Sequence, residues 1–234
     1  SLQGLFKAFS KVDDYNNLVS SLKESNTNPF RATVTDSAKP FLLGSMWKDI
    51  NKTFLVVCPK PEDARLMIAQ LDSYFGEESS IFHFPELEVI PYERVRADKQ
   101  IEHQRLVCLN ALSSNTYNPN PLIVTSNIAL MQRTIHSSLM ADLPEIIKAG
   151  QKIQIESTLK SWTAMGYDFE EHVYQKGSFS RRGGILDIFS PQMEFPARLE
   201  LWGEVVEAIR LFDPLTQRSV ANVDQILVIP SQEI

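Results

Sequence analysis

Three residues that could make contacts with another protein recur at alternate positions of one short segment: Arg198, Glu200 and Trp202. Alternate side chains of a β-strand point to the same face, so these three would share a face, and the apolar residues between them would line the other. Exposed arginine and tryptophan side chains are the types that anchor protein–protein interfaces. The pattern therefore predicts a binding surface. The alternative is that Trp202 covers a neighbouring segment and that Arg198 is simply solvated.

Catalytic and metal-binding patterns are not evident in the sequence. Cys58 and Cys108 both lie in apolar segments, which favours buried thiols of a reducing compartment. The four histidines add no spacing typical of a metal site. His172, beside Glu170 and Glu171, comes nearest to an acid–base group, but such a triplet is more typical of a surface. We therefore expect no catalytic residue, no metal and no cofactor.

A β-hairpin is the element that would carry the predicted surface. Gly203-Glu204, a two-residue loop that begins with glycine, separates the Arg198 segment from a second apolar run, Val205–Phe212. Another apolar run, Ile185–Phe189, predicts a preceding strand. A short helix over 156–165 and a closing strand over 226–230 complete the pattern. This half of the chain is predicted to form a small α+β module over residues 136–234.

The first half alternates helical and strand patterns, which is typical of an α/β domain with a parallel sheet. The chain begins with a helical pattern over 2–25, followed by an extended segment over 30–34. The continuous apolar run 53–58 predicts a buried parallel strand. The remaining predicted elements are helices over 42–50, 61–74, 101–111 and 127–132, and strands over 80–84 and 122–125. We therefore predict N-terminal helices over 1–28 and the α/β domain over 29–135.

Composition limits the class of protein. The 234 residues are 43% hydrophobic and 22% charged, as expected for a globular chain of one large or two small domains. The formal net charge of −6 argues against a strong grip on the DNA backbone, although a pair such as Arg181-Arg182 could act locally. No apolar run reaches membrane-spanning length, and the N-terminus lacks a signal-peptide pattern. We expect a cytoplasmic protein that does not enter a membrane.

A longer ordered pattern surrounds the Arg198 segment. Arg182-Gly183 precedes Leu186-Asp187-Ile188-Phe189, and the segment 198–202 is followed by Leu211-Phe212-Asp213. This combination resembles domain 2 of two bacterial families, the excision-repair protein UvrB and the transcription-repair coupling factor. It extends over about thirty residues in fixed order, which makes it far more specific than a single short motif.

The resemblance implies a phosphate-binding loop, G-x-x-x-x-G-K-[ST], near the start of the α/β domain. The matching segment is 33–40, in which only Lys39 is retained. Ala38 replaces the glycine that lets the backbone approach phosphate, and Asp36 brings a negative charge to the same place. Pro40 replaces the hydroxyl residue that would hold Mg²⁺. We therefore expect a degenerate P-loop fold that does not bind nucleotide, with Lys39 solvated.

This degenerate loop separates the two families, because UvrB keeps a working ATPase loop and the coupling factor does not in its N-terminal UvrB-homology region. Ser126-Asn127 follows the strand 122–125 where a metal-binding acidic pair would be expected. Segment 84–93 is similar to a proline- and acid-containing segment of the coupling factor, and it lacks the tyrosine cluster with which UvrB holds damaged DNA. The resemblance favours the coupling factor. The alternatives are a fragment of a UvrB-type ATP-dependent helicase and an unrelated α/β enzyme.

The coupling-factor resemblance implies a recruitment module rather than an enzyme. In that family, domain 2 binds UvrA, and the contact residues correspond here to Arg182, Arg198 and Trp202. Glu200, between the last two, would orient Arg198 or contact the partner. The whole protein displaces a stalled RNA polymerase by ATP-driven translocation on DNA. Its motor and its contacts with polymerase and DNA are expected in other modules.

Overall fold

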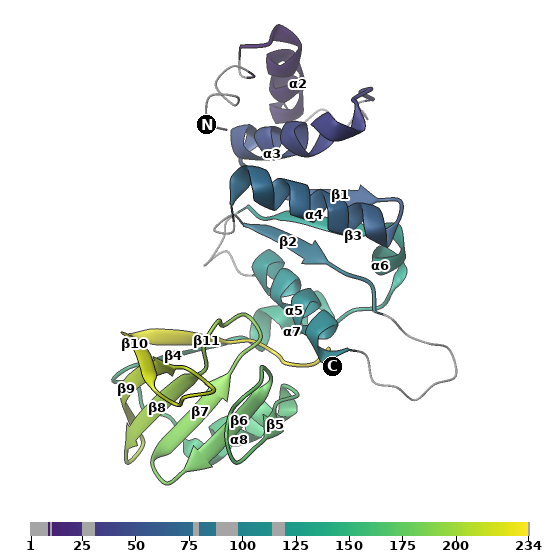
Figure 1. Cartoon of the computed structure of the whole chain (residues 1–234). Helices are drawn as coiled ribbons and strands as arrows, with labels where there is room; N and C mark the ends of the chain where they lie inside the picture. The colour runs from purple at the N-terminus through teal and green to yellow at the C-terminus, as the bar shows by residue number, and fades with distance from the viewer. Residues whose placement is uncertain are drawn as a thin grey trace, which may run out of the picture. The chain divides into compact units, whose positions relative to one another are not determined.

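The computed structural model describes residues 9, 11–24, 31–76, 80–87, 98–113 and 120–233. The chain divides into two compact units, residues 1–86 with 115–131 and residues 87–114 with 132–234. We describe each unit by itself (Figure 1). Part of the predicted first helix, the start of the predicted extended segment and most of segment 84–93 lie outside the described residues.

The first unit contains a parallel sheet of three strands in the order β1-β3-β2, as the α/β prediction requires. Figure 1 shows helix α4 lying along this sheet. The elements of the unit are α2 (Asp13–Lys23), the 3₁₀ turn η1 (Asp36–Ala38), α3 (Lys39–Ile50), β1 (Phe54–Cys58), α4 (Pro61–Phe75), β2 (Ile81–Phe84), β3 (Leu122–Ser126) and α6 (Asn127–Met131). The predicted strands over 53–58, 80–84 and 122–125 are all present.

Burial differs between the strands of this sheet. The central strand β3 is buried at every position, and Val124 packs against Ala64 and Leu71 of α4. Strand β1 lies at the edge, and its residues Leu55 and Val57 are about half exposed. The prediction of a buried strand over 53–58 is therefore wrong for one face of β1. An apolar run shows that a strand is hydrophobic, but the elements that pack on each face of the sheet decide how many of its faces are covered.

The second unit contains a six-stranded sheet in the order β10-β9-β8-β7-β6-β5 and a two-stranded sheet of β11 and β4. Its elements are α5 (Lys99–Ser113), α7 (Ser137–Asp142), β4 (Glu145–Lys148), α8 (Ile155–Ala164), β5 (Asp168–Phe169), β6 (Ser178–Arg182), β7 (Ile185–Phe189), β8 (Ala197–Trp202), β9 (Val205–Phe212), β10 (Ser219–Val223) and β11 (Gln225–Val228). Strands β8 and β9 form the predicted hairpin, and Gly203 in its turn has a φ of 63°. The small α+β module is confirmed.

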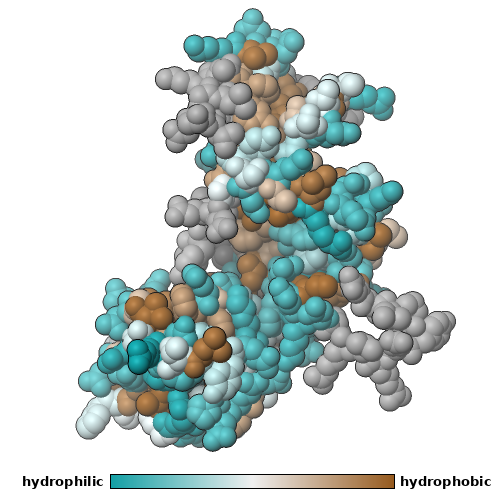
Figure 2. Space-filling model, in the orientation of Figure 1, coloured by the Kyte–Doolittle hydropathy of each residue, from teal (hydrophilic) through white to brown (hydrophobic). Residues whose placement is uncertain are grey.

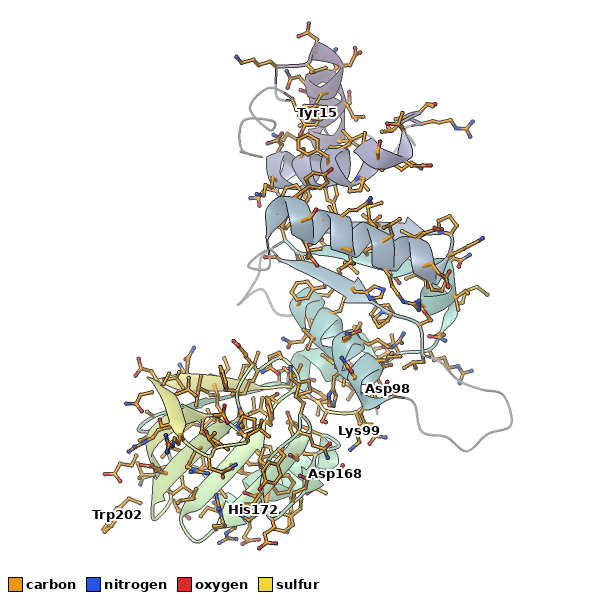
Figure 3. All side chains as sticks on the ribbon, in the orientation of Figure 1. Tyr15, Asp98, Lys99, Asp168, His172 and Trp202 are labelled. Carbon is orange, nitrogen blue, oxygen red and sulfur yellow. The ribbon has the colours of Figure 1, made fainter. Side chains whose placement is uncertain are left out.

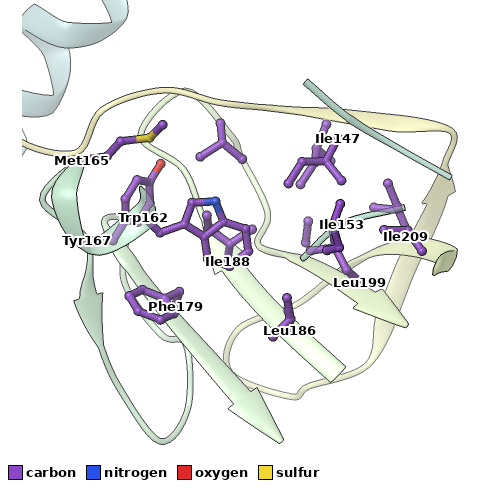
Figure 4. Close-up of a cluster of buried hydrophobic side chains, with 14 residues drawn as sticks. Ile147, Ile153, Trp162, Met165, Tyr167, Phe179, Leu186, Ile188, Leu199 and Ile209 are labelled. Carbon is purple, nitrogen blue, oxygen red and sulfur yellow. The ribbon is translucent and has the colours of Figure 1, made fainter. Parts of the chain in front are cut away.

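One face of the six-stranded sheet forms the hydrophobic core of this unit. Leu186, Leu199 and Ile209, on three neighbouring strands, belong to one buried cluster (Figure 4). Trp162 of α8 is fully buried in the same cluster, with its ring 5.6 Å from that of Phe179. Because strand side chains alternate, covering this face leaves the other face of the sheet to the residues between these apolar ones.

Helix α5 belongs to the second unit, whereas the sequence placed it in the α/β domain over 29–135. The fully buried Arg105 forms an ion pair with Glu233 and donates a hydrogen bond to the backbone carbonyl of Arg133 at 3.2 Å. The His103 ring nitrogen lies 3.1 Å from the Ser231 hydroxyl. These partners are far away along the chain, so no local pattern could have predicted them.

Candidate protein-binding surface

The exposed side of the six-stranded sheet is polar, and we call it the polar face. The alternating burial of β8 places Arg198 and Glu200 opposite the core residues, as predicted. Trp202 follows them, while Leu201 packs on the core side after a bulge in the pairing of β8 with β9. Cross-strand pairing brings Asp187 and Arg210 beside Arg198. The polar face is formed by Arg182, Asp187, Arg198, Glu200, Trp202 and Arg210.

A buried carboxylate lies at the centre of the polar face. The side chain of Asp187 is only 1% exposed. The Arg198 Nε and Nη2 atoms donate to Asp187 Oδ1 and Oδ2, each at 2.8 Å, which is the bidentate geometry of a strong arginine–carboxylate pair. The Arg182 Nη2 atom donates to the same Oδ2 at 2.9 Å. Sequence reasoning treated Asp187 only as part of a motif, although an aspartate inside an apolar strand was a signal for a buried ion pair.

Arg198 is held on two further sides. Its guanidinium lies 4.5 Å from the centre of the Phe212 ring, within range of a cation–π contact. Its Nη2 atom also donates to Gln217 Oε1 at 3.1 Å. The hydrogen bond with Asp187 raises the pKa of Arg198 above its usual value. Because its side chain is only 20% exposed, the interpretation of Arg198 as a simply solvated residue is wrong.

Glu200 does not orient Arg198. Its carboxylate instead accepts a hydrogen bond from Arg210 Nη2 at 3.0 Å, across the β8–β9 pairing. Both side chains of this pair are substantially exposed, so the pair adds little to stability. Asp187 performs the orienting role that the sequence suggested for Glu200, and contact between Glu200 and a partner stays a prediction.

Trp202 lies at the end of β8 and is 80% exposed. Figure 3 shows its side chain projecting away from the sheet. It therefore does not cover a neighbouring segment of the described chain, which was the alternative interpretation. A tryptophan ring in this position offers a large apolar area to a partner at a low cost in side-chain entropy.

The polar face keeps unused donors and excess positive charge. Arg182 is 42% exposed. Within the described part of the chain, Nε and Nη1 of Arg182 and Nη1 of Arg198 have no hydrogen-bond partner. Three guanidinium groups face two carboxylates, Asp187 and Glu200. The chemistry of the face therefore suits a partner that presents carboxylates together with an apolar hollow.

The degenerate phosphate loop has a different geometry from a working one. Residues 31–35 contain no strand, so the extended segment predicted over 30–34 does not lead from the sheet into this loop. Lys39 Nζ lies 2.6 Å from Asp36 Oδ1, so Lys39 is ion-paired rather than only solvated as predicted. The same hydrogen bond raises the pKa of Lys39 and lowers that of Asp36. Pro40 lies in the first turn of α3. A nucleotide phosphate would meet the Asp36 carboxylate beside the only retained cation.

The carboxyl ends of β2 and β3, where parallel sheets commonly bind ligands, are occupied by internal contacts. The Ser126 hydroxyl accepts a hydrogen bond from the backbone of Ala129 at 3.1 Å and so caps α6. It also lies 3.4 Å from the Glu86 carboxylate, which forms an ion pair with Arg65. Ser126, the last residue of β3, thus starts a helix in the place where a metal-binding carboxylate would be expected.

The other candidate groups have structural surroundings. Burial raises the pKa of the Cys108 thiol to about 12, and both cysteines are buried and unbonded to each other. The ring of His172 stacks on Tyr174, with 6.0 Å between the ring centres. No group of His, Cys, Asp and Glu within the described ranges is arranged to hold a metal ion.

The described helices are too short or too polar to cross a membrane. Hydrophilic side chains dominate the view of the surface in Figure 2.

Comparison with known proteins shows which protein family matches the part of the chain that carries this surface. Residues 146–234 match the family described as UvrB interaction domain, a range that includes α8 and the whole six-stranded sheet. Residues 146–234 of the second unit therefore form a UvrB-type interaction domain. The polar face lies within the matched range.

Relatives extend the match to the first unit. The transcription-repair coupling factor of Myxococcus xanthus is 30% identical over 203 residues, 85% of this chain and 17% of that protein. The coupling factor of Bacillus subtilis (strain 168) is 26% identical over 222 residues, 95% of this chain and 18% of that protein. UvrABC system protein B of Thermosipho africanus (strain TCF52B) is 21% identical over 245 residues, 98% of this chain and 36% of that protein.

The chain therefore belongs to the transcription-repair coupling factor family, as its N-terminal UvrB-homology region. It spans less than a fifth of the length of the two coupling factors that it matches.

Proposed function

We propose that this chain is the recruitment module of a coupling factor and that it binds UvrA through the polar face. The observation that carries the proposal is the combination of two arginines fixed by a buried aspartate with an exposed tryptophan on the same sheet face. The match to a UvrB interaction domain supports it, because the matched residues include this face. The resemblance to domain 2 supplies UvrA as the partner.

The physical basis of binding lies in preorganisation. A free arginine loses about 0.5–1.5 kcal/mol of side-chain entropy when an interface immobilises it. Arg198 has already lost that freedom, because Asp187, Gln217 and Phe212 hold it. Its remaining donors can then pair with partner carboxylates without a further ordering cost. Trp202 supplies the apolar contact area.

This segment acts without nucleotide hydrolysis in the proposed function. The Asp36–Lys39 pair and Pro40 disfavour the binding of phosphate and Mg²⁺ at the degenerate loop. Translocation on DNA and contact with stalled RNA polymerase are assigned to other modules of a longer cytoplasmic protein. The module delivers UvrA, and with it nucleotide excision repair, to the stalled polymerase.

A UvrB-type repair helicase is the second candidate function. The match to UvrABC system protein B, which extends over 98% of this chain, favours it. The degenerate phosphate loop argues against the helicase function, because such a helicase needs to bind ATP. Saturable binding of Mg-ATP to this chain would support the helicase and contradict the recruitment module.

The test is binding to purified UvrA, measured by isothermal titration. Trp202→Ala should weaken binding at least tenfold, since truncation of a central interface tryptophan costs about 2 kcal/mol or more. Arg182→Ala, on an exposed arginine of the same face, should also weaken it. Leu66→Ala is the matched control, because Leu66 is an exposed apolar residue of α4 in the other unit.

Two results would contradict the proposal. A wild-type chain that does not bind UvrA at micromolar concentration would remove the function. Folded Trp202→Ala and Arg182→Ala variants that both bind as well as wild type would remove the polar face as the site.

A further inference from the structure

We infer that Asp187 is a positioning residue of the polar face: it fixes Arg182 and Arg198 in the geometry in which they contact the partner. The inference rests on the proposed function, since it concerns the same surface. It assigns a role to a residue that cannot itself reach a partner, because its side chain is 1% exposed.

The position of Asp187 follows from the alternation of β7. Leu186 and Ile188 on either side point into the core and are fully buried, so Asp187 points to the polar face. The pairing of β7 with β6 and β8 places it between the strands that carry the two arginines. Both of its oxygens are engaged by guanidinium groups.

Stability alone does not require this arrangement. A buried ion pair can often be replaced by apolar residues of similar volume with no loss of stability, because burial of the charges costs as much as their attraction returns. What the carboxylate adds is geometry. One carboxylate orients two guanidinium groups, and the cluster of the three keeps one net positive charge and outward donors for a partner.

Gln217 is a second support for Arg198. Its backbone has a φ of 60°, and its side-chain amide donates to the Pro214 carbonyl at 2.8 Å while its oxygen accepts from Arg198. The backbone N–H of Gln217 donates to Asp213 O at 2.8 Å. The loop of residues 213–218, between β9 and β10, is therefore held in place by its own hydrogen bonds. Arg198 lies between this loop and Asp187.

The decisive variant is Asp187→Asn, which keeps the size of the side chain and removes its charge. We expect UvrA binding to weaken about thirtyfold, at the lower end of the range found when one partner of a buried charge pair is removed. The Arg198 Nε–H resonance in ¹H–¹⁵N spectra of the unbound chain should shift and exchange faster with water, because its acceptor loses its charge. Backbone amide resonances away from the polar face should remain.

Ser190→Ala is the matched control. Ser190 is fully buried in the same unit, and its hydroxyl contacts Tyr167 and the backbone of Ile229 rather than the arginines. This variant should lose stability and still bind UvrA within about twofold of wild type once folded. A weakening equal to that of Asp187→Asn would mean that general destabilisation explains both, and it would overturn the inference.

The remaining outcomes also test whether Asp187 positions the arginines. If the wild-type chain binds UvrA and the folded Asp187→Asn variant binds it equally strongly, the positioning role is overturned and the proposed function is left intact. If Asp187→Asn does not fold, Gln217→Asn decides, since asparagine tolerates the left-handed backbone but is one methylene shorter. About threefold weaker binding by Gln217→Asn would support positioning. Unchanged binding would overturn it.

Discussion

Replacing Arg198 by alanine should destabilise the second unit, even though the residue lies on an open sheet face. The Arg198 side chain makes two hydrogen bonds to Asp187, one to Gln217 and a cation–π contact with Phe212. Its removal leaves the buried Asp187 carboxylate with a single bond from Arg182. Replacing a solvated arginine by alanine or glutamate would leave the fold nearly untouched. The structure gives the opposite expectation for both substitutions.

The magnitude follows from these contacts. Removing one partner of a buried ion pair costs about 3–5 kcal/mol, because the remaining charge stays buried without compensation. Arg182 still provides partial compensation, so we expect about 3 kcal/mol for Arg198→Ala. In a unit of this size, that loss corresponds to a fall in melting temperature of roughly 11 °C. Arg198→Glu should cost more, since it places a second carboxylate beside Asp187.

Urea unfolding followed by the fluorescence of Trp162 measures this effect, because Trp162 is fully buried in the core of the same unit. Trp202→Ala is the matched comparison on the same strand. Its side chain is 80% exposed, so truncation should change the free energy of unfolding by only about 0.5 kcal/mol. The same variant also removes the fluorescence of an exposed tryptophan.

An Arg198→Ala chain that unfolds at the same urea concentration as wild type would refute the reasoning. It would mean that the buried Asp187 carboxylate does not depend on Arg198 for its stability. The converse result for Trp202→Ala, a loss of several kcal/mol, would show that the tryptophan packs against the fold and is not available to a partner.

Three further outcomes are expected. Titration of the chain with Mg-ATP at millimolar concentration should produce no binding heat, because the Asp36 carboxylate is paired with Lys39, the cation retained from the phosphate-loop motif. Binding to duplex DNA, measured by fluorescence anisotropy, should be weak and should vanish at physiological salt, as the net charge of −6 implies; submicromolar binding there would contradict it. Burial lowers the pKa of His103 from 6.5 to about 4, so the unfolded chain binds a proton in this interval that the folded chain does not. Stability should therefore fall as the pH drops from 6.5 toward 4, and His103→Gln should flatten that part of the curve.

Local patterns predicted the elements of this protein well. The glycine-led loop Gly203-Glu204 predicted the β8–β9 hairpin, because few residues other than glycine adopt a positive φ without strain. Period-two alternation predicted which side chains of β8 would share a face, and the burial pattern agrees. Both features depend on neighbours within a few residues, so the sequence states them directly.

Contacts across strands and between distant segments could not be predicted in the same way. The pairing of Arg198 with Asp187 depends on the register of β7 against β8, and alternation alone does not specify which residue of the next strand lies opposite. The exposure of Leu55 and Val57 on β1 depends on which elements pack on that face of the sheet, and a strand's own sequence does not specify this. Helix α5 joins the second unit through Arg105 and Glu233, residues with no local relation.

For the candidate site, the sequence alone determined that Arg198, Glu200 and Trp202 share a face, which follows from alternation, whereas Arg182 was named through the resemblance. The tertiary structure decided how they act. It showed that Trp202 is open to solvent and that Glu200 pairs with Arg210. It also showed that a buried carboxylate holds the two arginines. Periodicity fixes the side to which a residue points, whereas its partner, its burial and its remaining hydrogen-bond donors arise only when the strands are packed side by side.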